Sequence, residues 1–149
     1  MAKVNPYMRF LGPEDHLQRA VLNYLSMQYP HSLVAHPANE GKRSPFERFK
    51  LKYLGVSSGI PDILIFTPSK QFSGLAIELK AGYNKPTKNQ TEWLENLKLC
   101  NWYAVWLNDF ENCKIIIDQY FKNGYEVHIP LLQRGTTKDR SQTRRNYRR

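Results

Sequence analysis

The chain has 149 residues, a formal net charge of +9 and a hydrophobic fraction of 41%. A chain of this length suits one domain, and its hydrophobic residues suffice for a packed core, which excludes disorder throughout. The positive excess favours a polyanionic partner, either nucleic acid or an acidic membrane surface.

The positions of the charged residues and the cysteines indicate which kind of partner and which cellular compartment are expected. Residues 134–149 carry seven Lys or Arg and one acid, so six of the nine net positive charges lie in this tail. The two cysteines, Cys100 and Cys113, form no CxxC pair, which fits a reducing compartment. The N-terminus shows no secretory signal, and the longest apolar runs are too short to cross a bilayer. We therefore expect a cytoplasmic protein without a membrane partner.

The first predicted elements are an arm, a helix and a short strand. Residues 1–12 have the character of an arm, and Pro13 then begins an apolar pattern with fourfold spacing that continues to Gln28. Since proline is well tolerated in a first helical turn, this pattern predicts a helix over 13–28. The apolar stretch at 33–36 predicts a short strand.

A capping box marks the start of a second helix. Ser44, Pro45 and Glu47 suit its N-cap, first and third positions, and Gly55 suits its C-terminal end. The apolar side chains expected to line the buried face of this helix are Phe46, Phe49, Tyr53 and Leu54.

The second half of the chain alternates strands and helices. Residues 63–66 form a near-continuous apolar run and residues 75–80 alternate, which together predict an antiparallel hairpin. Thr87 and Gln90 form a second capping box, at the start of a helix with Trp93, Leu94 and Leu97 facing inward. The remaining predicted elements are a strand at 103–106, a helix from Asn108 or Asp109 towards Phe121, and a short strand at 125–130.

These elements predict a small mixed α/β domain. The strand that follows a helical crossover should run parallel to its neighbour, whereas the hairpin is antiparallel, so the central sheet is mixed and flanked by helices. We assign this domain to residues 13–133. The arm at 1–12 precedes it, and a polar, basic tail at 134–149 follows it and is expected to be disordered.

The strand at 75–80 places two charged residues on one face. Alternate residues of a strand share a face, so the leucines and the isoleucine should point to the core while Glu78 and Lys80 point the other way. Asp62 stands at the start of the preceding strand, where a hairpin can bring its carboxylate beside Glu78.

Two adjacent carboxylates and a lysine suit hydrolysis of a phosphodiester. Neighbouring carboxylates repel each other unless a hard divalent cation lies between them, and carboxylate with backbone oxygen is the ligand set that Mg²⁺ prefers. Such a metal polarises a phosphoryl oxygen, and Lys80 could orient the attacking water or stabilise the developing charge. The same residues also have an ordinary interpretation, because Glu-x-Lys is common on exposed strands and Asp after Pro is common in turns.

Four stretches of the sequence occur together in the order and spacing of one known family. These stretches are Glu14 to Gln18, His36 to Ser44, Gly59 to Asp62 with Glu78 to Lys80, and Pro86 to Gln90. Through them the chain resembles the virus-type replication-repair nuclease (VRR-NUC) domain of the PD-(D/E)xK superfamily, in its stand-alone phage and bacterial form. The resemblance covers about Glu14 to Phe121, and the basic tail is not part of it.

The resemblance implies a restriction-endonuclease-like fold and a metal-dependent endonuclease that hydrolyses DNA. The metal, Mg²⁺ or Mn²⁺ in its place, would be bound by Asp62, Glu78, the Leu79 carbonyl and, directly or through water, Glu14. The catalytic residues that it implies are Glu14, Gln18, Asp62, Glu78, Lys80 and Gln90. It implies no small-molecule cofactor.

The resemblance also implies a homodimer that acts on branched DNA, like a Holliday-junction resolvase, in the cytoplasm of a bacterium or of a phage-infected host. The expected DNA contacts in the first loop are His36, Asn39, Lys42 and Arg43. Those in the tail, where they should add salt-dependent affinity, are Arg134, Lys138, Arg140, Arg144, Arg145, Arg148 and Arg149.

Five of these residues and the function as a whole keep alternatives. Gln90 could serve only its capping box, and Glu14 could be only a first-turn acid stabilised by the helix dipole. Lys42 and Arg43 could belong to a solvated loop, and His36 could be an ordinary strand histidine with its hydrogen bonds satisfied. The protein could be a noncatalytic nucleic-acid-binding protein, or a nuclease that prefers RNA, flaps or ends. The noncatalytic alternative gives no reason for two acids and a lysine on neighbouring strands.

Overall fold

The computed structural model describes residues 5–37 and 43–122. Within these ranges a mixed sheet of four strands has the order β1-β2-β3-β4. β1 (Val34–Ala35) and β2 (Ile63–Ile65) are antiparallel, as are β2 and β3 (Gly74–Leu79), whereas β3 and β4 (Trp102–Leu107) are parallel. The predicted mixed sheet and its antiparallel hairpin are thus confirmed.

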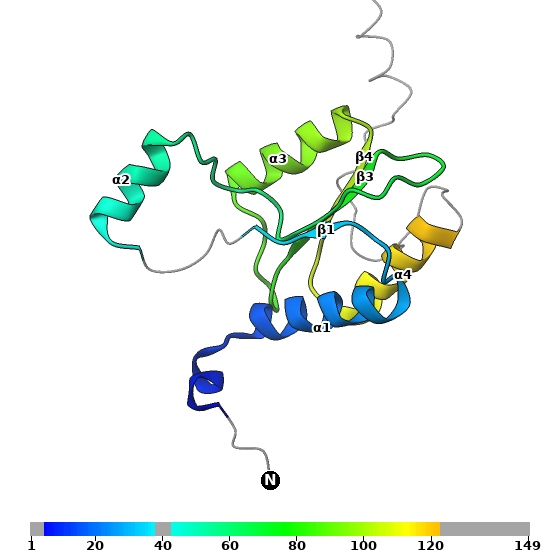
Figure 1. Ribbon diagram of the computed structural model, residues 1–149, viewed down its shortest axis with the longest axis horizontal. Coiled ribbons are helices and arrows are strands. Elements are labelled where there is room, and N and C mark those ends of the chain that lie inside the picture. The colour runs from blue at the N-terminus through cyan, green and yellow to red at the C-terminus, as the bar shows by residue number, and fades with distance from the viewer. Residues whose placement is uncertain (1–4, 38–42, 123–149) are drawn as a thin grey trace, which may run out of the picture.

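Helices cover both faces of this sheet (Figure 1). α1 (Pro13–Gln28) and α4 (Phe110–Lys122) pack on one face, and α3 (Lys88–Leu99) lies on the other and links β3 to β4. A short 3-10 helix, η1 (Pro6–Phe10), precedes α1. The α/β fold predicted from the sequence is confirmed, and none of the helices in these ranges is long and apolar enough to span a bilayer.

The two faces of β3 have different partners, as the alternation of its residues predicts. Leu75, Ile77 and Leu79 belong to the larger core, together with apolar residues of β2, α1 and α4. Ala76 belongs to a smaller core under α3, where Leu94 is buried. Every residue of β3 is buried, so the strand that carries Glu78 is held between two packed layers.

α2 (Pro45–Tyr53) departs from the prediction. Its start is as expected, because Ser44 Oγ accepts a hydrogen bond from Glu47 N and Ser44 N donates to the Glu47 carboxylate. The predicted buried face, however, is wrong: Phe46, Phe49, Tyr53 and Leu54 are between 62% and 80% exposed.

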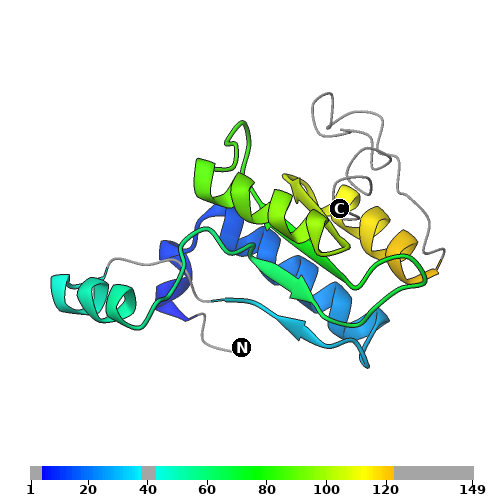
Figure 2. The same ribbon diagram turned by 90° about the horizontal axis from the view of Figure 1, so that it is seen from above.

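The reason for this exposure lies in the position of α2. The helix projects from the layered body, and the two views agree that it stands apart from the sheet and its flanking helices (Figures 1 and 2). An apolar stripe shows that a helix has a face to cover, but it does not specify what covers that face.

Some predictions concern residues outside the described ranges. The strand expected at 125–130 and the basic tail at 134–149 lie there, as do parts of the first loop. In the described ranges the helix ends agree closely with expectation, and Asp109 Oδ1 accepts a hydrogen bond from Asn112 N at the start of α4.

Candidate active site

The register of the hairpin places Asp62 opposite Glu78. Ile63 pairs with Ile77 in the antiparallel ladder. The residue before Ile63 therefore faces the residue after Ile77, and these two residues are Asp62 and Glu78. Residues that pair directly across an antiparallel ladder lie on the same face of the sheet. The two carboxylates predicted to act together therefore share one face at the end of β3.

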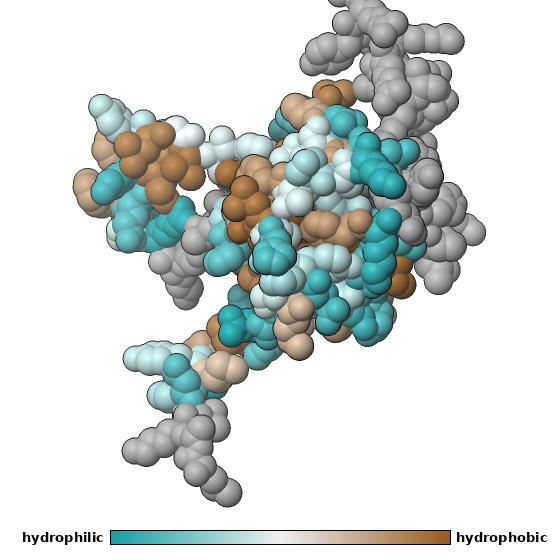
Figure 3. Space-filling model, turned by 45° about the vertical axis from the view of Figure 1, so that its right-hand side comes forward, coloured by the Kyte–Doolittle hydropathy of each residue, from teal (hydrophilic) through white to brown (hydrophobic). Residues whose placement is uncertain are grey.

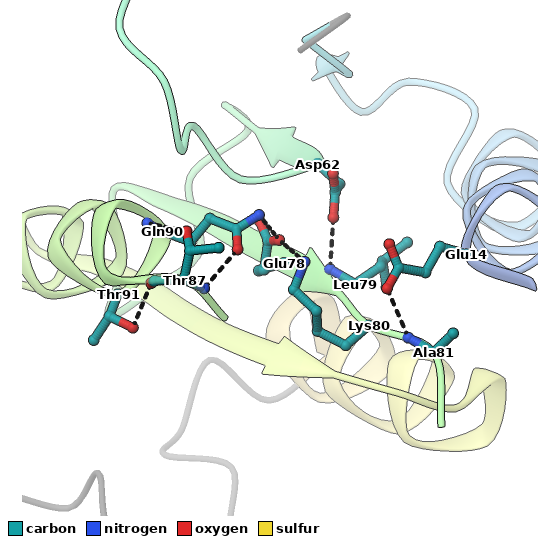
Figure 4. Close-up of polar contacts among 9 residues, drawn as sticks. All are labelled: Glu14, Asp62, Glu78, Leu79, Lys80, Ala81, Thr87, Gln90 and Thr91. Atoms are coloured by element: carbon teal, nitrogen blue, oxygen red, sulfur yellow. Dashed lines mark hydrogen bonds and ion pairs between the residues drawn. The ribbon is translucent and has the colours of Figure 1, made fainter. Parts of the chain in front are cut away.

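The Asp62 side chain is anchored to the backbone of β3. Its Oδ2 accepts a hydrogen bond from Leu79 N at 2.7 Å. Figure 4 shows the Asp62 carboxylate reaching towards β3 at this point, between Glu78 and Lys80. The anchor fixes one acid at a defined place beside the strand that carries the other acid and the lysine.

Glu78 and Lys80 form a buried ion pair. Glu78 is fully buried and Lys80 is 7% exposed, and 2.7 Å separate Lys80 Nζ from Glu78 Oε1. Charged groups are retained at such positions only when they are paired and hydrogen-bonded, because their desolvation is unfavourable. The pair therefore places a fixed positive and a fixed negative charge at the end of a rigid strand.

Gln90 connects this ion pair to α3. Its Nε2 donates a short hydrogen bond to Glu78 Oε1, and its Oε1 accepts a hydrogen bond from Thr87 N at 2.8 Å. The same side chain thus completes the capping box of α3 and holds the Glu78 carboxylate (Figure 4). The two interpretations of Gln90 do not exclude each other, because the opposite ends of one amide serve the two roles.

Glu14 approaches the site from the first turn of α1. Its Oε1 accepts a hydrogen bond from Ala81 N at 2.9 Å, just beyond Lys80 on the chain (Figure 4). Gln18 lies one turn further along α1 and is half-buried. In the described part of the chain, Gln18 makes no hydrogen bond to Glu14.

The charge of Lys80 reflects all three acids. Burial lowers the pKa of Lys80, but the hydrogen bond to Glu78 and the negative charges of Glu78, Glu14 and Asp62 outweigh it. The pKa of Lys80 is consequently raised above its ordinary value, and the side chain is an ammonium at neutral pH. An ammonium surrounded by carboxylates suits the stabilisation of a negatively charged reacting group.

The donor set fits a divalent metal through two carboxylates rather than three. Among residues 5–37 and 43–122, no three His, Cys, Asp or Glu side chains lie close enough to hold one ion together, so Glu14 does not join Asp62 and Glu78 in a compact cluster. Magnesium is commonly bound by one or two carboxylates and completes its shell with water. Asp62, Glu78 and a backbone carbonyl of β3 meet that requirement.

The loop before Asp62 is held against the first turn of α3, a contact that the sequence did not predict. Asn89 Nδ2 donates a hydrogen bond to Ser58 Oγ at 2.8 Å. Gly59 has a φ of +88°, and a Cβ at this position would lie 2.7 Å from the Asn89 carbonyl carbon and 2.9 Å from Gln90 N. Gly59 therefore allows the loop before Asp62 to approach the backbone of α3 closely.

The predicted DNA contacts are only partly described. His36 is exposed just after β1, and Arg43 is half-buried just before α2. The other expected DNA contacts, Asn39, Lys42, Arg134, Lys138, Arg140, Arg144, Arg145, Arg148 and Arg149, lie outside the described residues.

Comparisons with known proteins agree on one family. The model of the VRR-NUC domain matches residues 10–108. A solved structure described as a VRR_NUC domain protein is 30% identical over 75% of this chain and 90% of its own, with a TM-score of 0.60. A second one, described as a VRR_NUC domain, is 19% identical over 74% of this chain and all of its own, with a TM-score of 0.52, and supports the fold alone. Among curated proteins, no match was found.

Proposed function

Because this chain belongs to the VRR-NUC family and is a nuclease of the PD-(D/E)xK type, we propose that it is a Mg²⁺-dependent endonuclease for branched DNA that acts as a homodimer. Mn²⁺ should substitute for Mg²⁺. We take residues 13–133 as the nuclease domain, between an arm at 1–12 and the basic tail at 134–149, and we place its action in the cytoplasm.

One observation carries this proposal: Asp62, Glu78 and Lys80 meet at the end of β3. The hairpin register puts the two acids on one face, and Lys80 contacts Glu78 directly. A noncatalytic nucleic-acid-binding protein has no need of a buried acid–lysine pair beside a second acid. Desolvation of such a pair is unfavourable, so its presence in the buried site favours a catalytic role.

We assign the metal to Asp62, Glu78 and the carbonyl of Leu79, with Glu14 acting through water. When bound, the ion would neutralise charge on the scissile phosphate and lower the pKa of a coordinated water. Lys80 would orient the attacking water and stabilise the negative charge that develops at phosphorus. Gln90 would keep the Glu78 carboxylate in place, and Gln18, one turn along α1 from Glu14, would support that acid without a direct hydrogen bond.

The homodimer is supported by the exposed apolar face of α2. Four large side chains of this face are exposed, and the projecting lobe carries a hydrophobic patch in Figure 3. Apolar patches on a projecting element commonly mark protein interfaces. A helix of nine residues is also marginally stable without tertiary contacts. A second copy of the chain would cover the patch and stabilise the helix.

The symmetry of such a dimer supports branched DNA as the substrate. Two copies related by a twofold axis present two active sites in matching orientation, as two symmetric cuts across a four-way junction require. The net charge of +9 favours binding of the phosphate backbone, to which His36, Arg43 and the tail would contribute.

The decisive experiment compares four-way junction, flap, duplex, single-stranded DNA and RNA substrates in Mg²⁺, Mn²⁺ and EDTA. We expect the wild type to cut the junction with either metal and to be inert in EDTA. Lys80→Ala should bind the junction without cutting it. Lys114→Ala, which removes an ion-paired lysine of α4, is the matched control and should cut normally. Normal cutting by Lys80→Ala would overturn the assignment, and a preference for flaps or RNA would revise the substrate.

A further inference from the structure

A tight turn follows directly on the catalytic strand. Lys80 N donates to Leu107 O at 2.9 Å, which extends the β3–β4 ladder by one residue. Asn84 N then donates to Ala81 O at 3.1 Å and closes a four-residue turn. Gly82, the second residue of this turn, has a φ of +54°, a conformation that glycine adopts readily. The turn therefore begins one residue after Lys80.

Two further contacts anchor the turn to the body. Ala81 N donates to Glu14 Oε1 at 2.9 Å, and Gly82 O accepts a hydrogen bond from Asn108 Nδ2 at 3.1 Å. α1 and the end of β4 thus hold the base of the turn. The contact with Glu14 lies within the candidate active site (Figure 4), so the turn and the site form one structural unit.

Tyr83 lies at the tip of this anchored turn and is fully exposed. Its relative exposure is 103%, the highest of the exposed large hydrophobic residues in the described part of the chain. No ring contact or hydrogen bond of its side chain occurs within residues 5–37 and 43–122. Asn84 and Lys85 beside it are also exposed. An aromatic ring is thus presented to solvent by a backbone that is fixed.

We propose that Tyr83 stacks on an unpaired nucleobase of the DNA next to the phosphodiester that is cut. Aromatic side chains bind unpaired bases by stacking, which strengthens binding about tenfold or more per base and tolerates any sequence. The exposed Lys85 favours a polyanion over an apolar protein partner at this tip. This inference rests on the proposed function, and it adds a residue that binds an unpaired base beside the site.

The test measures binding and cleavage separately. The probe is a splayed DNA duplex that carries 2-aminopurine at one of the first unpaired positions beyond the branch, each position in turn. Binding is measured in Ca²⁺. The wild type should quench the fluorescence at one or two positions, and Tyr83→Ala should lose this quenching and bind about tenfold more weakly. Tyr83→Trp should restore both properties, since it restores a stacking ring.

Two controls make the result specific to stacking. Tyr7→Ala removes another exposed tyrosine, in η1, and should leave quenching and affinity unchanged. Replacing the quenched base by an abasic site should weaken the wild type about as much as Tyr83→Ala, and the two changes together should be no worse than either alone. Additive losses, or unchanged binding and quenching in Tyr83→Ala, would overturn the inference.

Cleavage in Mg²⁺ is followed in parallel to keep the two proposals apart. Tyr83→Ala should raise KM about tenfold and change kcat less than about threefold, because stacking positions the substrate without touching the reacting atoms. A wild type that quenches the probe but cuts no DNA would refute the proposed function and leave the base contact standing. A wild type that cuts with the same KM as Tyr83→Ala would refute the base contact alone.

Discussion

Lys80 Nζ lies 2.7 Å from Glu78 Oε1, inside a site where the glutamate is completely buried. Only one residue separates them in the chain, and Lys80 extends β3 through its hydrogen bond to Leu107, so the two side chains meet once this strand forms. Their burial does require the sheet and α3. The pair is therefore local in origin, but its strength depends on the layers around it.

The first prediction concerns this ion pair. Lys80→Met should abolish detectable cutting and reduce the free energy of unfolding by about 3–5 kcal/mol, because it leaves a buried carboxylate unpaired. The double variant Glu78→Gln with Lys80→Met should recover much of that stability and none of the activity. Urea unfolding and junction cleavage measure the two effects. Equal stability of the two variants would contradict the buried pairing.

The second prediction concerns the contact between Gly59 and α3. Gly59→Ala should lower the free energy of unfolding by about 1–3 kcal/mol and impair cutting, because its Cβ would meet the backbone of Asn89 and displace Asp62. Gly55→Ala is the matched control: Gly55 also has a positive φ, but a Cβ there meets nothing within 4 Å. The free energy of unfolding of Gly55→Ala should fall less than that of Gly59→Ala, and Gly55→Ala should cut at the wild-type rate.

The third prediction separates the two roles of Gln90. Thr87→Ala removes the hydroxyl that caps α3 but leaves the Gln90 amide beside Glu78, so it should cost about 1 kcal/mol in stability and leave activity nearly intact. Gln90→Ala removes both contacts and should reduce cutting as well. Thermal unfolding and initial rates in Mg²⁺ distinguish the variants. If both lost activity equally, the cap itself would be the functional element.

The fourth prediction concerns pH and a polar cluster between α1 and α4. Tyr24 and Tyr29 both donate to Asp118 Oδ1, at 2.7 and 2.6 Å. Burial raises the pKa of Asp118, but these hydrogen bonds and the charges of two lysines outweigh it, so the pKa is lowered on balance. A lowered carboxyl pKa stabilises the fold above the pKa of the unfolded chain, and this stabilisation is lost as pH falls through the folded pKa.

Asp118→Asn should therefore be less stable than the wild type at pH 7, and the difference should shrink in acid. The cluster should also weaken in strong alkali, because the hydrogen bond to Asp118 raises the pKa of Tyr24 to about 12 and the fold favours its neutral form. Urea titrations at pH 7 and pH 3 provide the measurement. If the difference in free energy of unfolding between the two proteins were the same at both pH values, the hydrogen bonds would not be stabilising the ionised form of Asp118.

The fifth prediction concerns the exposed face of α2. Phe49 stacks on Tyr53 in this face, with 6.2 Å between the ring centroids. Phe49→Glu should convert the proposed dimer to a monomer, because a charge in an apolar interface is unfavourable. Sedimentation velocity gives the mass. Leu99→Glu places the same charge on an exposed residue at the end of α3 and should leave the dimer intact. A wild type that is monomeric at all concentrations would refute the dimer.

Much of the fold follows from local patterns in the sequence. The alternation along β3 determined which residues face the larger core and that Glu78 and Lys80 share the other face, because successive side chains of a strand point in opposite directions. The capping boxes at Ser44 and Thr87 determined where two helices begin, because each box is closed within four residues. Such features depend on backbone geometry over a few positions.

Only the tertiary structure decided the remainder. Three features depend on how distant segments pack. α2 projects with Phe49 exposed, Gln90 donates a hydrogen bond to Glu78, and the backbone at Gly59 lies against Asn89. A hydrophobic pattern indicates that a surface must be covered, and a buried polar side chain requires a hydrogen-bonding partner. Neither feature specifies which segment of the chain supplies the cover or the partner. That choice is made when the layers of the sheet and helices assemble, since packing selects among many contacts that the local sequence permits equally.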